Sequence, residues 1–144
     1  MRPTRDEHFL AMAALVATRS TCVRRAVGCV LVDVHQHVAA TGYNGRPRGF
    51  DHCSEGMPCL GARAPSGTDL DDCEAVHAEQ NALLQCRDVE LLDACYVTVS
   101  PCLTCVKLLL NTSCRRVVAA APYAHDAAAR ELWLRGGRRW EVGR

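Results

Sequence analysis

The sequence predicts an α/β fold of three layers, in which helices cover both faces of a mixed central sheet. In the second half of the chain, β-branched stretches alternate with helix-forming stretches, which is typical of crossovers between parallel strands. In the first half, two apolar stretches flank a short turn, which predicts a hairpin. The length of 144 residues and the hydrophobic content of 49% suit one core, so we expect residues 1–144 to form a single domain.

Each element is expected from its own pattern. Residues 6–19 place apolar side chains at helical spacing, whereas residues 94–100 alternate between apolar and polar side chains, as a strand does. Because proline suits the first turn of a helix, Pro101 is expected to open one. The expected helices are 6–19, 74–86, 101–111 and 124–134. The expected strands are 27–34, 38–41, 94–100, 116–121 and 138–142, with a turn at 35–37.

Residues 42–72 follow neither the helical nor the strand period. Gly, Pro, Asp and Ser dominate this stretch. A segment of this length without regular structure is uncommon inside a compact domain, and it is usually functional. We therefore expect a long functional loop at about 42–72, and a bound metal is one way to hold it.

The overall charge and the cysteine content narrow the function classes. The net charge is +1 and no basic run stands out, which argues against a surface that grips a long nucleic acid. No apolar run approaches the ~20 residues of a membrane span, and the N-terminus lacks the apolar core of a signal peptide. Ten cysteines in such a chain indicate metal ligands and buried thiols rather than disulfides. We expect a cytoplasmic protein.

Two short motifs carry the chemistry. The first is His77-Ala78-Glu79, and the second is Pro101 followed by Cys102 and Cys105 in C-x-x-C spacing. One histidine and two cysteines supply the three protein ligands of a catalytic zinc site, which keeps a fourth position for water. A helix N-terminus at each motif favours the thiolate form of cysteine and brings both motifs to one ion.

Glu79 is the candidate proton carrier at this site. It lies two residues after His77, so its carboxylate can reach the same pocket without binding zinc. Alone, C-x-x-C is often a structural zinc knuckle or a redox pair, and H-x-E on a helix usually faces solvent. Together and in this order, with the proline in place, they form the signature of zinc-dependent nucleobase deaminases.

Six stretches of the chain match one known family. They are Ser20–Gly28, Gly42–Gly45, His52–Cys53, Cys73–Leu84 (CEAVHAEQNALL), Tyr96–Cys105 (YVTVSPCLTC) and Tyr123. On these residues the chain resembles the deoxycytidylate (dCMP) deaminases of the cytidine deaminase superfamily, and it looks closest to the bacterial and phage enzymes. The H-A-E and P-C-x-x-C motifs are shared across the superfamily. The arginine-containing segment before Gly28 and the G-Y-N-G segment favour the nucleotide branch.

The resemblance implies a cytidine deaminase-like fold and the zinc-dependent hydrolysis of dCMP to dUMP and ammonia. Water activated by zinc would attack C4 of cytosine, and Glu79 would move the protons. The resemblance also implies that Arg24 binds the phosphate, that Asn44 contacts the sugar or phosphate, and that Tyr123 lies near the nucleotide. Ser100 departs from the phenylalanine or glutamate that relatives often carry.

Each of these substrate contacts has a structural alternative. Arg24 can be a solvated arginine, and its neighbour Arg25 is a weaker candidate for the phosphate. Asn44 lies in an N-G pair that favours a turn, and both interpretations of it can hold. Tyr123 can serve plain packing after Pro122.

The remaining cysteines fall into two groups. Relatives in the bacterial and phage branch often hold a second, structural zinc, and the candidate ligands are Cys22, Cys53, Cys59 and Cys73, with His52 as an alternative. Four thiolates would close a tetrahedral site and tie the long loop, whereas the alternative is four unpaired thiols. The others are expected to be small buried hydrophobes, namely Cys29, Cys86, Cys95 and Cys114. No function is expected for His8, His35, His37 and His125.

Other functions stay open at this point. One alternative is a deaminase of free cytidine, of a modified cytosine nucleotide or of adenosine in transfer RNA, although the last needs a grip on a large anion. The other is a non-enzymatic, zinc-stabilised binding module, but a structural site would not require Glu79. The resemblance further implies a homo-oligomer, often a hexamer, that dCTP activates and dTTP inhibits through the G-Y-N-G region.

Overall fold

The computed structural model describes residues 1–53, 65 and 73–143. One five-stranded sheet runs through the molecule in the order β2-β1-β3-β4-β5. The strands are β1 (Gly28–Asp33), β2 (Val38–Tyr43), β3 (Leu92–Val99), β4 (Arg116–Ala121) and β5 (Arg139–Val142). The helices are α1 (Arg5–Ala17), α2 (Ala78–Gln85), the 3-10 helix η2 (Val89–Leu91), α3 (Leu103–Leu110) and α4 (Ala127–Arg135).

The sheet is mixed, as expected. Strand β1 pairs antiparallel with both β2 and β3, whereas β3, β4 and β5 run parallel to one another. The parallel half follows from the chain order, because α3 connects β3 to β4 and α4 connects β4 to β5. The hairpin of β1 and β2 turns at Gln36, which has a φ of 64°.

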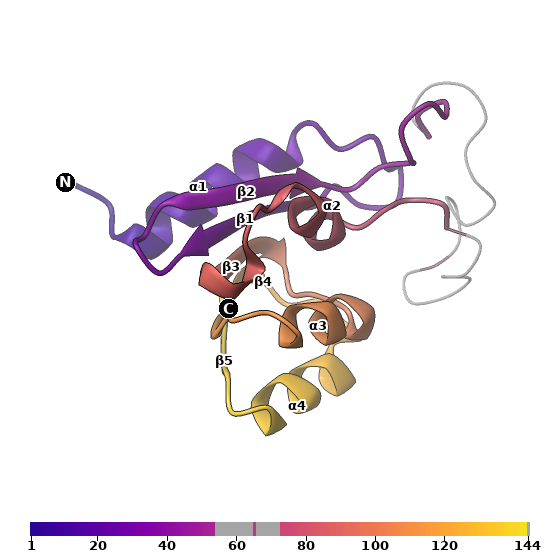
Figure 1. Ribbon diagram of the computed structural model, residues 1–144. Coiled ribbons are helices and arrows are strands. Elements are labelled where there is room, and N and C mark those ends of the chain that lie inside the picture. Colours follow the sequence, from indigo (N-terminus) through magenta and orange to yellow (C-terminus); the bar gives the residue numbers. More distant parts are fainter. Residues whose placement is uncertain (54–64, 66–72, 144) are drawn as a thin grey trace.

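Helices cover both faces of the sheet and confirm the three layers. Helix α1 packs Phe9 and Ala13 against one face, where Tyr96 and Val118 lie. Helices α2, α3 and α4 pack on the other face around the fully buried Trp133. Figure 1 shows α1 on one side of the strands and the other three helices on the opposite side. Alternating side chains of the strands therefore enter two separate cores.

Helix α2 begins at Ala78, later than the start at residue 74 that the sequence pattern predicts. Val76 is extended instead, because it pairs antiparallel with Gly45. The Val76 N–H donates to the Gly45 carbonyl at 2.8 Å, and the Gly45 N–H donates back at 3.1 Å. This two-residue bridge makes His77 the N-cap of the helix.

The prediction that Pro101 opens a helix is also wrong by two residues. Helix α3 begins at Leu103, and Cys102 is its extended N-cap with a φ of −74° and a ψ of 172°. Helix α4 begins at Ala127 rather than at residue 124. A turn precedes it, in which the Asp126 N–H donates to the Tyr123 carbonyl at 3.2 Å.

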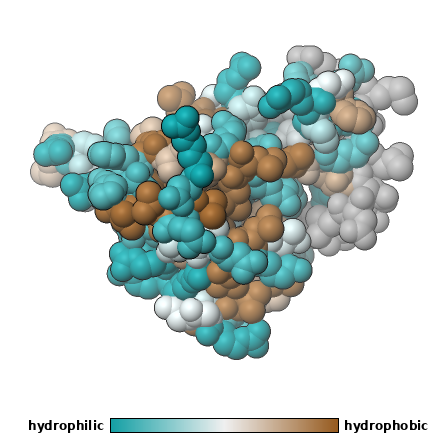
Figure 2. Space-filling view, viewed as in Figure 1, coloured by the Kyte–Doolittle hydropathy of each residue, from teal (hydrophilic) through white to brown (hydrophobic). Residues whose placement is uncertain are grey.

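The outer surface combines polar residues with some large apolar side chains. Figure 2 shows hydrophobic side chains in brown across the middle of this face, with hydrophilic side chains in teal around them. Leu84 on α2 is 79% exposed, and Leu103 and Leu108 on α3 are also exposed. No helix in the described part of the chain is long and apolar enough to cross a membrane.

Candidate active site

His77, Cys102 and Cys105 converge between the N-termini of α2 and α3. The Nδ1 atom of His77 lies 3.3 Å from the Cys105 sulfur and 3.4 Å from the Cys102 sulfur. The three donor atoms all lie within 4.8 Å of one another. The two motifs, which are 25 residues apart at Cys102 and His77, thus meet at one point as the sequence predicts.

The fold fixes the position of each donor. The Gln80 side chain accepts the His77 N–H at 2.8 Å, which holds the backbone of the N-cap. On the other side, β3 ends at Val99, and Pro101 is fully buried. Cys105 lies in the first turn of α3 and is completely buried. The N–H groups of that turn favour a negative sulfur, because the helix dipole is positive at this end.

The electrostatics of the three donors are coupled. A hydrogen bond from Cys105 lowers the pKa of Cys102 to about 4, against the opposing effect of burial and with support from His77. The same hydrogen bond, together with burial, raises the pKa of Cys105 far above its usual range. A hydrogen bond to Cys102 raises the pKa of His77. These shifts favour the thiolate form of Cys102, which is the form that binds a metal ion.

This donor set fits a zinc ion. Zinc prefers nitrogen and sulfur ligands in tetrahedral geometry. With Zn–N of about 2.0 Å and Zn–S of about 2.3 Å, a tetrahedral ion separates nitrogen from sulfur by about 3.5 Å. The separations of 3.3 and 3.4 Å are close to that value. Three donors leave one tetrahedral position for a further ligand.

Glu79 lies in the first turn of α2 beside this group. Its side chain is buried, with 4% exposure, and burial raises the pKa of its carboxyl. The nearby Cys105 thiol has a smaller, opposing effect on the pKa of Glu79. Among the described residues, the metal-binding group consists of His77, Cys102 and Cys105, so Glu79 is available for proton transfer.

The structure separates the two candidate arginines. Arg24 is half-buried, and its Nη2 donates to the carbonyl of Pro65 at 2.9 Å. Arg25 is exposed, and its guanidinium lies over the Tyr123 ring, 5.0 Å from the centroid. Of the two, Arg25 is thus the one that contacts a further predicted substrate residue.

Asn44 is buried, with 7% exposure, and its side chain holds the segment that carries both arginines. The Oδ1 atom accepts the Ser20 hydroxyl at 2.6 Å and the Val27 N–H at 2.8 Å. The Nδ2 atom donates to the Arg25 carbonyl at 2.6 Å. The turn that the N-G pair favours does not form, since Gly45 pairs with Val76, and Asn44 instead holds the backbone through its side chain; a substrate contact stays a prediction.

The proposed second zinc lies partly outside the described residues, because Cys59 is one of its candidate ligands. Cys53 is buried and packs against Cys73. Cys22 is half-buried. In the described part of the chain, no cluster of three or more donors other than the one at His77 is found. The ligand set of a second site stays a prediction.

Two residues contribute to the site through contacts that the sequence does not predict. Gly42 is one, because a Cβ there would overlap the backbone of α2 at Ala78 and Ala82. Ser100 is the other, since its hydroxyl donates to Asp126. Neither partner is close in sequence, so no local pattern could reveal these contacts. The expectation of buried thiols is confirmed for Cys29, Cys95 and Cys114, whereas Cys86 is half-buried.

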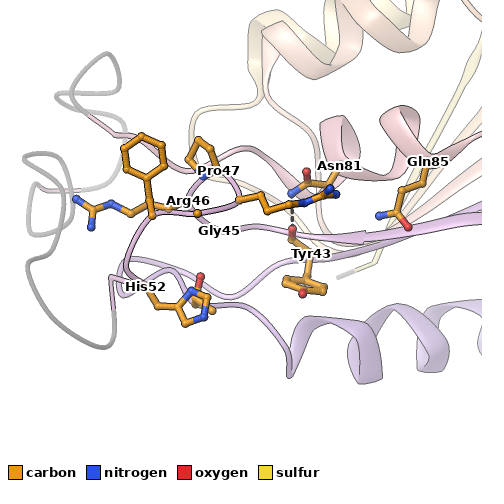
Figure 3. Close-up of a pocket in the computed structure, with 11 residues that line it drawn as sticks. Tyr43, Gly45, Arg46, Pro47, His52, Asn81 and Gln85 are labelled. Atoms are coloured by element: carbon orange, nitrogen blue, oxygen red, sulfur yellow. Dashed lines mark hydrogen bonds between the residues drawn. The ribbon is translucent and has the colours of Figure 1, made fainter.

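A separate cleft of about 330 Å³ lies between the segment that follows β2 and the part of α2 that carries Asn81 and Gln85. Figure 3 shows Tyr43, Arg46, His52 and Asn81 around it, and Asn81 donates to the Tyr43 carbonyl at 2.8 Å. Among the described residues, the three metal donors do not line it. The remaining labelled residues in the lining are Gly45, Pro47 and Gln85.

Residues 3–121 match the family described as the cytidine and deoxycytidylate deaminase zinc-binding region. The chain belongs to this family. The deoxycytidylate deaminase of Mycobacterium phage D29 is 43% identical to this chain over 122 residues, which cover 81% of this chain and 94% of the phage protein. That of Schizosaccharomyces pombe is 40% identical over 139 residues, which cover 94% of the chain and 43% of the yeast protein. The chain therefore spans less than half the length of the yeast relative.

Solved structures agree with this family assignment. The dCMP deaminase of cyanophage S-TIM5 in its apo form has a TM-score of 0.76 and 24% identity, and the match covers 99% of both chains. At that identity the likeness shows the fold. The structure of the same phage enzyme in complex with dCMP and dUMP has a TM-score of 0.75 and 25% identity, covering 99% of this chain and 98% of the other.

Proposed function

We propose that this protein hydrolyses dCMP to dUMP and ammonia. The observation that carries the proposal is Glu79, a buried carboxyl beside the metal-binding group that is not one of its members. A structural metal site needs no such carboxyl, whereas hydrolysis needs a group that moves protons. The choice of dCMP is supported by the phage D29 relative, a deoxycytidylate deaminase that matches over 94% of its length.

The residues of the chain divide the work as follows. His77, Cys102 and Cys105 would hold zinc, which supplies a Lewis acid that makes a water molecule reactive near neutral pH. Glu79 takes a proton from the attacking water and delivers it to N3 of cytosine as the C4–O bond forms. Glu79 then carries the second proton to the amine at C4. The C4–N bond breaks, and ammonia leaves the uracil ring of dUMP.

The phosphate of the nucleotide is proposed to bind the segment that Asn44 holds. A guanidinium matches phosphate because it offers two parallel donors. Arg24 is the candidate from the family resemblance, and Arg25 is supported by its position over Tyr123. Arg24→Ala and Arg25→Ala, assayed with dCMP and with deoxycytidine, separate the two. The phosphate ligand is the one whose loss lowers kcat/KM for dCMP but not for deoxycytidine.

A substrate panel tests the proposed activity. The zinc-loaded protein is incubated with dCMP, CMP, deoxycytidine or a transfer RNA, and released ammonia is measured. We expect dCMP to have the highest kcat/KM. Equal activity on dCMP and deoxycytidine would refute the phosphate contact, and activity confined to transfer RNA would replace the substrate. Absence of ammonia from every substrate, with zinc bound, would favour a binding module.

We also propose the second, structural zinc. The packing of Cys53 against Cys73 supports it, because two thiols at one place are half of a tetrahedral site. Metal analysis should give two zinc ions per chain, and Cys73→Ser should lower this to one without loss of the catalytic ion. One zinc per chain in the wild type would remove the proposal.

Effector binding and assembly are further parts of the proposal. The cleft beside α2 includes Tyr43 and Gly45 of the G-Y-N-G segment together with Arg46, and it suits a nucleoside triphosphate such as dCTP or dTTP.

Assembly into a homo-oligomer through α2 and α3 is supported by Leu84, whose side chain is 79% exposed. Light scattering of wild type and Leu84→Glu, with and without dCTP, tests both. A monomer insensitive to dCTP would contradict them.

The organisation of the chain completes the proposal. Residues 1–144 are proposed to form one domain with a functional loop at 42–72, and the single sheet from β1 to β5 supports this. A cytoplasmic location is supported by the buried thiols of Cys29, Cys95 and Cys114, since reduced cysteines are typical of a reducing compartment.

A further inference from the structure

We infer that Ser100 and Asp126 are positioning residues that lock the Tyr123 segment onto the metal-binding turn and thereby set the affinity for the nucleotide. The inference rests on the proposed function, since it assumes that Tyr123 lies at the substrate.

The hydroxyl of Ser100 makes two short hydrogen bonds inside the protein. It donates to Asp126 Oδ2 at 2.7 Å and accepts the Tyr123 N–H at 2.7 Å. The residue is buried, with 4% exposure. Its backbone N–H donates to the Ala121 carbonyl at 3.0 Å, which extends the pairing of β3 with β4. A buried hydroxyl with both partners in place is well defined in orientation.

The hydrogen bond between Ser100 and Asp126 connects the turn that carries Cys102 to the start of α4. Ser100 immediately precedes Pro101 and Cys102, so it belongs to the turn that presents a metal-binding sulfur. Asp126 is the N-cap of α4, and its carbonyl accepts the Arg130 N–H at 2.8 Å. The hydrogen bond thus joins the start of α4 directly to the metal-binding turn.

The segment between β4 and α4 carries the residues that respond to this contact. The Tyr123 ring lies under the Arg25 guanidinium at 5.0 Å and beside the His125 ring at 5.3 Å. Without the Ser100 hydroxyl, the Tyr123 N–H and the Asp126 carboxylate both lose a partner. The Tyr123 backbone is then free to move relative to Cys102, and the Tyr123–Arg25 pair moves with it. Displacement of a binding group weakens substrate binding before it alters the chemistry.

A set of variants tests this role. Ser100→Ala and Asp126→Ala remove one partner each, whereas Asp126→Asn keeps an oxygen that accepts the serine hydroxyl. Ser113→Ala is the matched control, because its half-buried hydroxyl also makes two hydrogen bonds, to the carbonyls of Val89 and Leu92, away from the metal. The readouts are KM and kcat for dCMP, zinc content, and hydrogen exchange of the Tyr123 amide.

We expect Ser100→Ala and Asp126→Ala to raise KM about tenfold, with kcat within about twofold and zinc content unchanged. Exchange of the Tyr123 amide should accelerate in Ser100→Ala. Asp126→Asn should restore a KM near that of the wild type. The double variant should be no worse than Ser100→Ala alone, because loss of the Ser100 hydroxyl already removes its hydrogen bond with Asp126. Ser113→Ala should leave KM and Tyr123 exchange unchanged.

The outcomes separate this inference from the proposed function. An unchanged KM in Ser100→Ala and Asp126→Ala would overturn the inference. A rise in KM that comes with lower kcat and lower zinc content would also overturn it, if Ser113→Ala shows the same changes. If the wild type does not deaminate dCMP, the proposed function fails. Hydrogen exchange then still decides whether the contact fixes Tyr123. Should Ser100→Ala not fold, the comparison of Asp126→Ala with Asp126→Asn gives the same decision.

Discussion

Glu79 differs from the other carboxylates near the ends of α2 in that it has little contact with water. Its neighbour along the chain, Glu74, is exposed and pairs with Arg46 at 2.6 Å. Burial opposes ionisation of Glu79, and the raised pKa of its carboxyl reflects this. A carboxyl that is easily protonated and lies beside a metal-binding group suits the transfer of two protons in one turnover.

Replacement of Glu79 by glutamine tests that role. Glu79→Gln keeps the shape of the side chain but cannot carry a proton, so turnover should fall by a factor of about 10²–10⁴ while zinc stays bound. Ammonia release and metal analysis measure the two effects. Glu74→Gln is the matched control and should retain activity. Turnover near the wild-type rate in Glu79→Gln would refute the role.

At the residue scale, the convergence of the three candidate metal donors could be predicted, whereas the substrate contacts could not. His77, Cys102 and Cys105 occur in motifs whose spacing is dictated by the geometry of one ion. Arg24 and Arg25 are adjacent and chemically identical, so only the path of the backbone decides which one reaches Tyr123. Ser100 was noted as unusual, but its partner Asp126 lies 26 residues away.

At the element scale, strands were easier to predict than helix starts. The strand β4 has the predicted bounds, because its apolar run is bounded by arginine at one end and by Pro122 at the other. The start of α2 depends instead on Val76 pairing with Gly45, a tertiary contact that overrides local helix propensity. The shift matters for function, since it turns His77 from an interior helix residue into the N-cap.

The packing of α2 on β2 makes Gly42 sensitive to substitution. A Cβ there would overlap the backbone of Ala78 and Ala82. Gly42→Ala should therefore push α2 away from the sheet, lower the free energy of unfolding by at least about 2 kcal/mol, and weaken zinc binding through His77. Urea unfolding and metal analysis measure both effects. Thr41→Ala, at a half-buried neighbour, is the control, and equal losses in the two variants would contradict the clash.

The C-terminal end of α3 depends on one side chain. Arg138 donates to four carbonyls at the end of this helix and in the following turn, at 2.7–3.1 Å, and its guanidinium lies 5.2 Å from the Trp133 ring centroid. The carbonyls belong to Leu109, Leu110, Thr112 and Cys114. One cation thus satisfies groups that a helix end leaves without partners.

Arg138→Ala should lower the free energy of unfolding by about 2–3 kcal/mol, because several charge-assisted hydrogen bonds are lost together. Arg135→Ala is the control, since Arg135 is exposed and its ion pair with Glu131 is 3.8 Å long. Chemical denaturation of both variants measures the difference. Equal stability of Arg138→Ala and the wild type would show that water replaces the guanidinium at no cost.

At the scale of the whole molecule, Arg116 joins helix α1 to two strands of the sheet. From β4 it donates to Asp6 on α1 at 2.8 Å and to Glu141 on β5 at 2.6 Å. Asp6 also accepts the Tyr96 hydroxyl of β3 at 2.6 Å. Burial opposes ionisation of Asp6, but the hydrogen bonds from Arg116 and Tyr96 outweigh it and hold the pKa of Asp6 below its usual value.

This network gives the stability a defined pH dependence. Because the pKa of Asp6 is lower in the folded than in the unfolded chain, its contribution is present above the unfolded value of about 3.9 and is lost as the pH falls through the folded value. Wild-type stability should therefore decline below about pH 4 more steeply than that of Asp6→Asn. Urea unfolding from pH 3 to pH 7 tests this, with the exposed Asp51→Asn as control. Parallel curves for wild type and Asp6→Asn would contradict it.

The bridge between Gly45 and Val76 also bears on how the sequence can change. Its two hydrogen bonds hold together the two ends of the segment that lies between these residues. The distance between the two ends is therefore set by the sheet and α2. Closing a chain between two such fixed points costs only about 0.6 kcal/mol more for each doubling of the number of residues between them. Insertions and deletions between these two residues should therefore change the free energy of folding only slightly. Evolution can vary this segment while the metal donors keep their places.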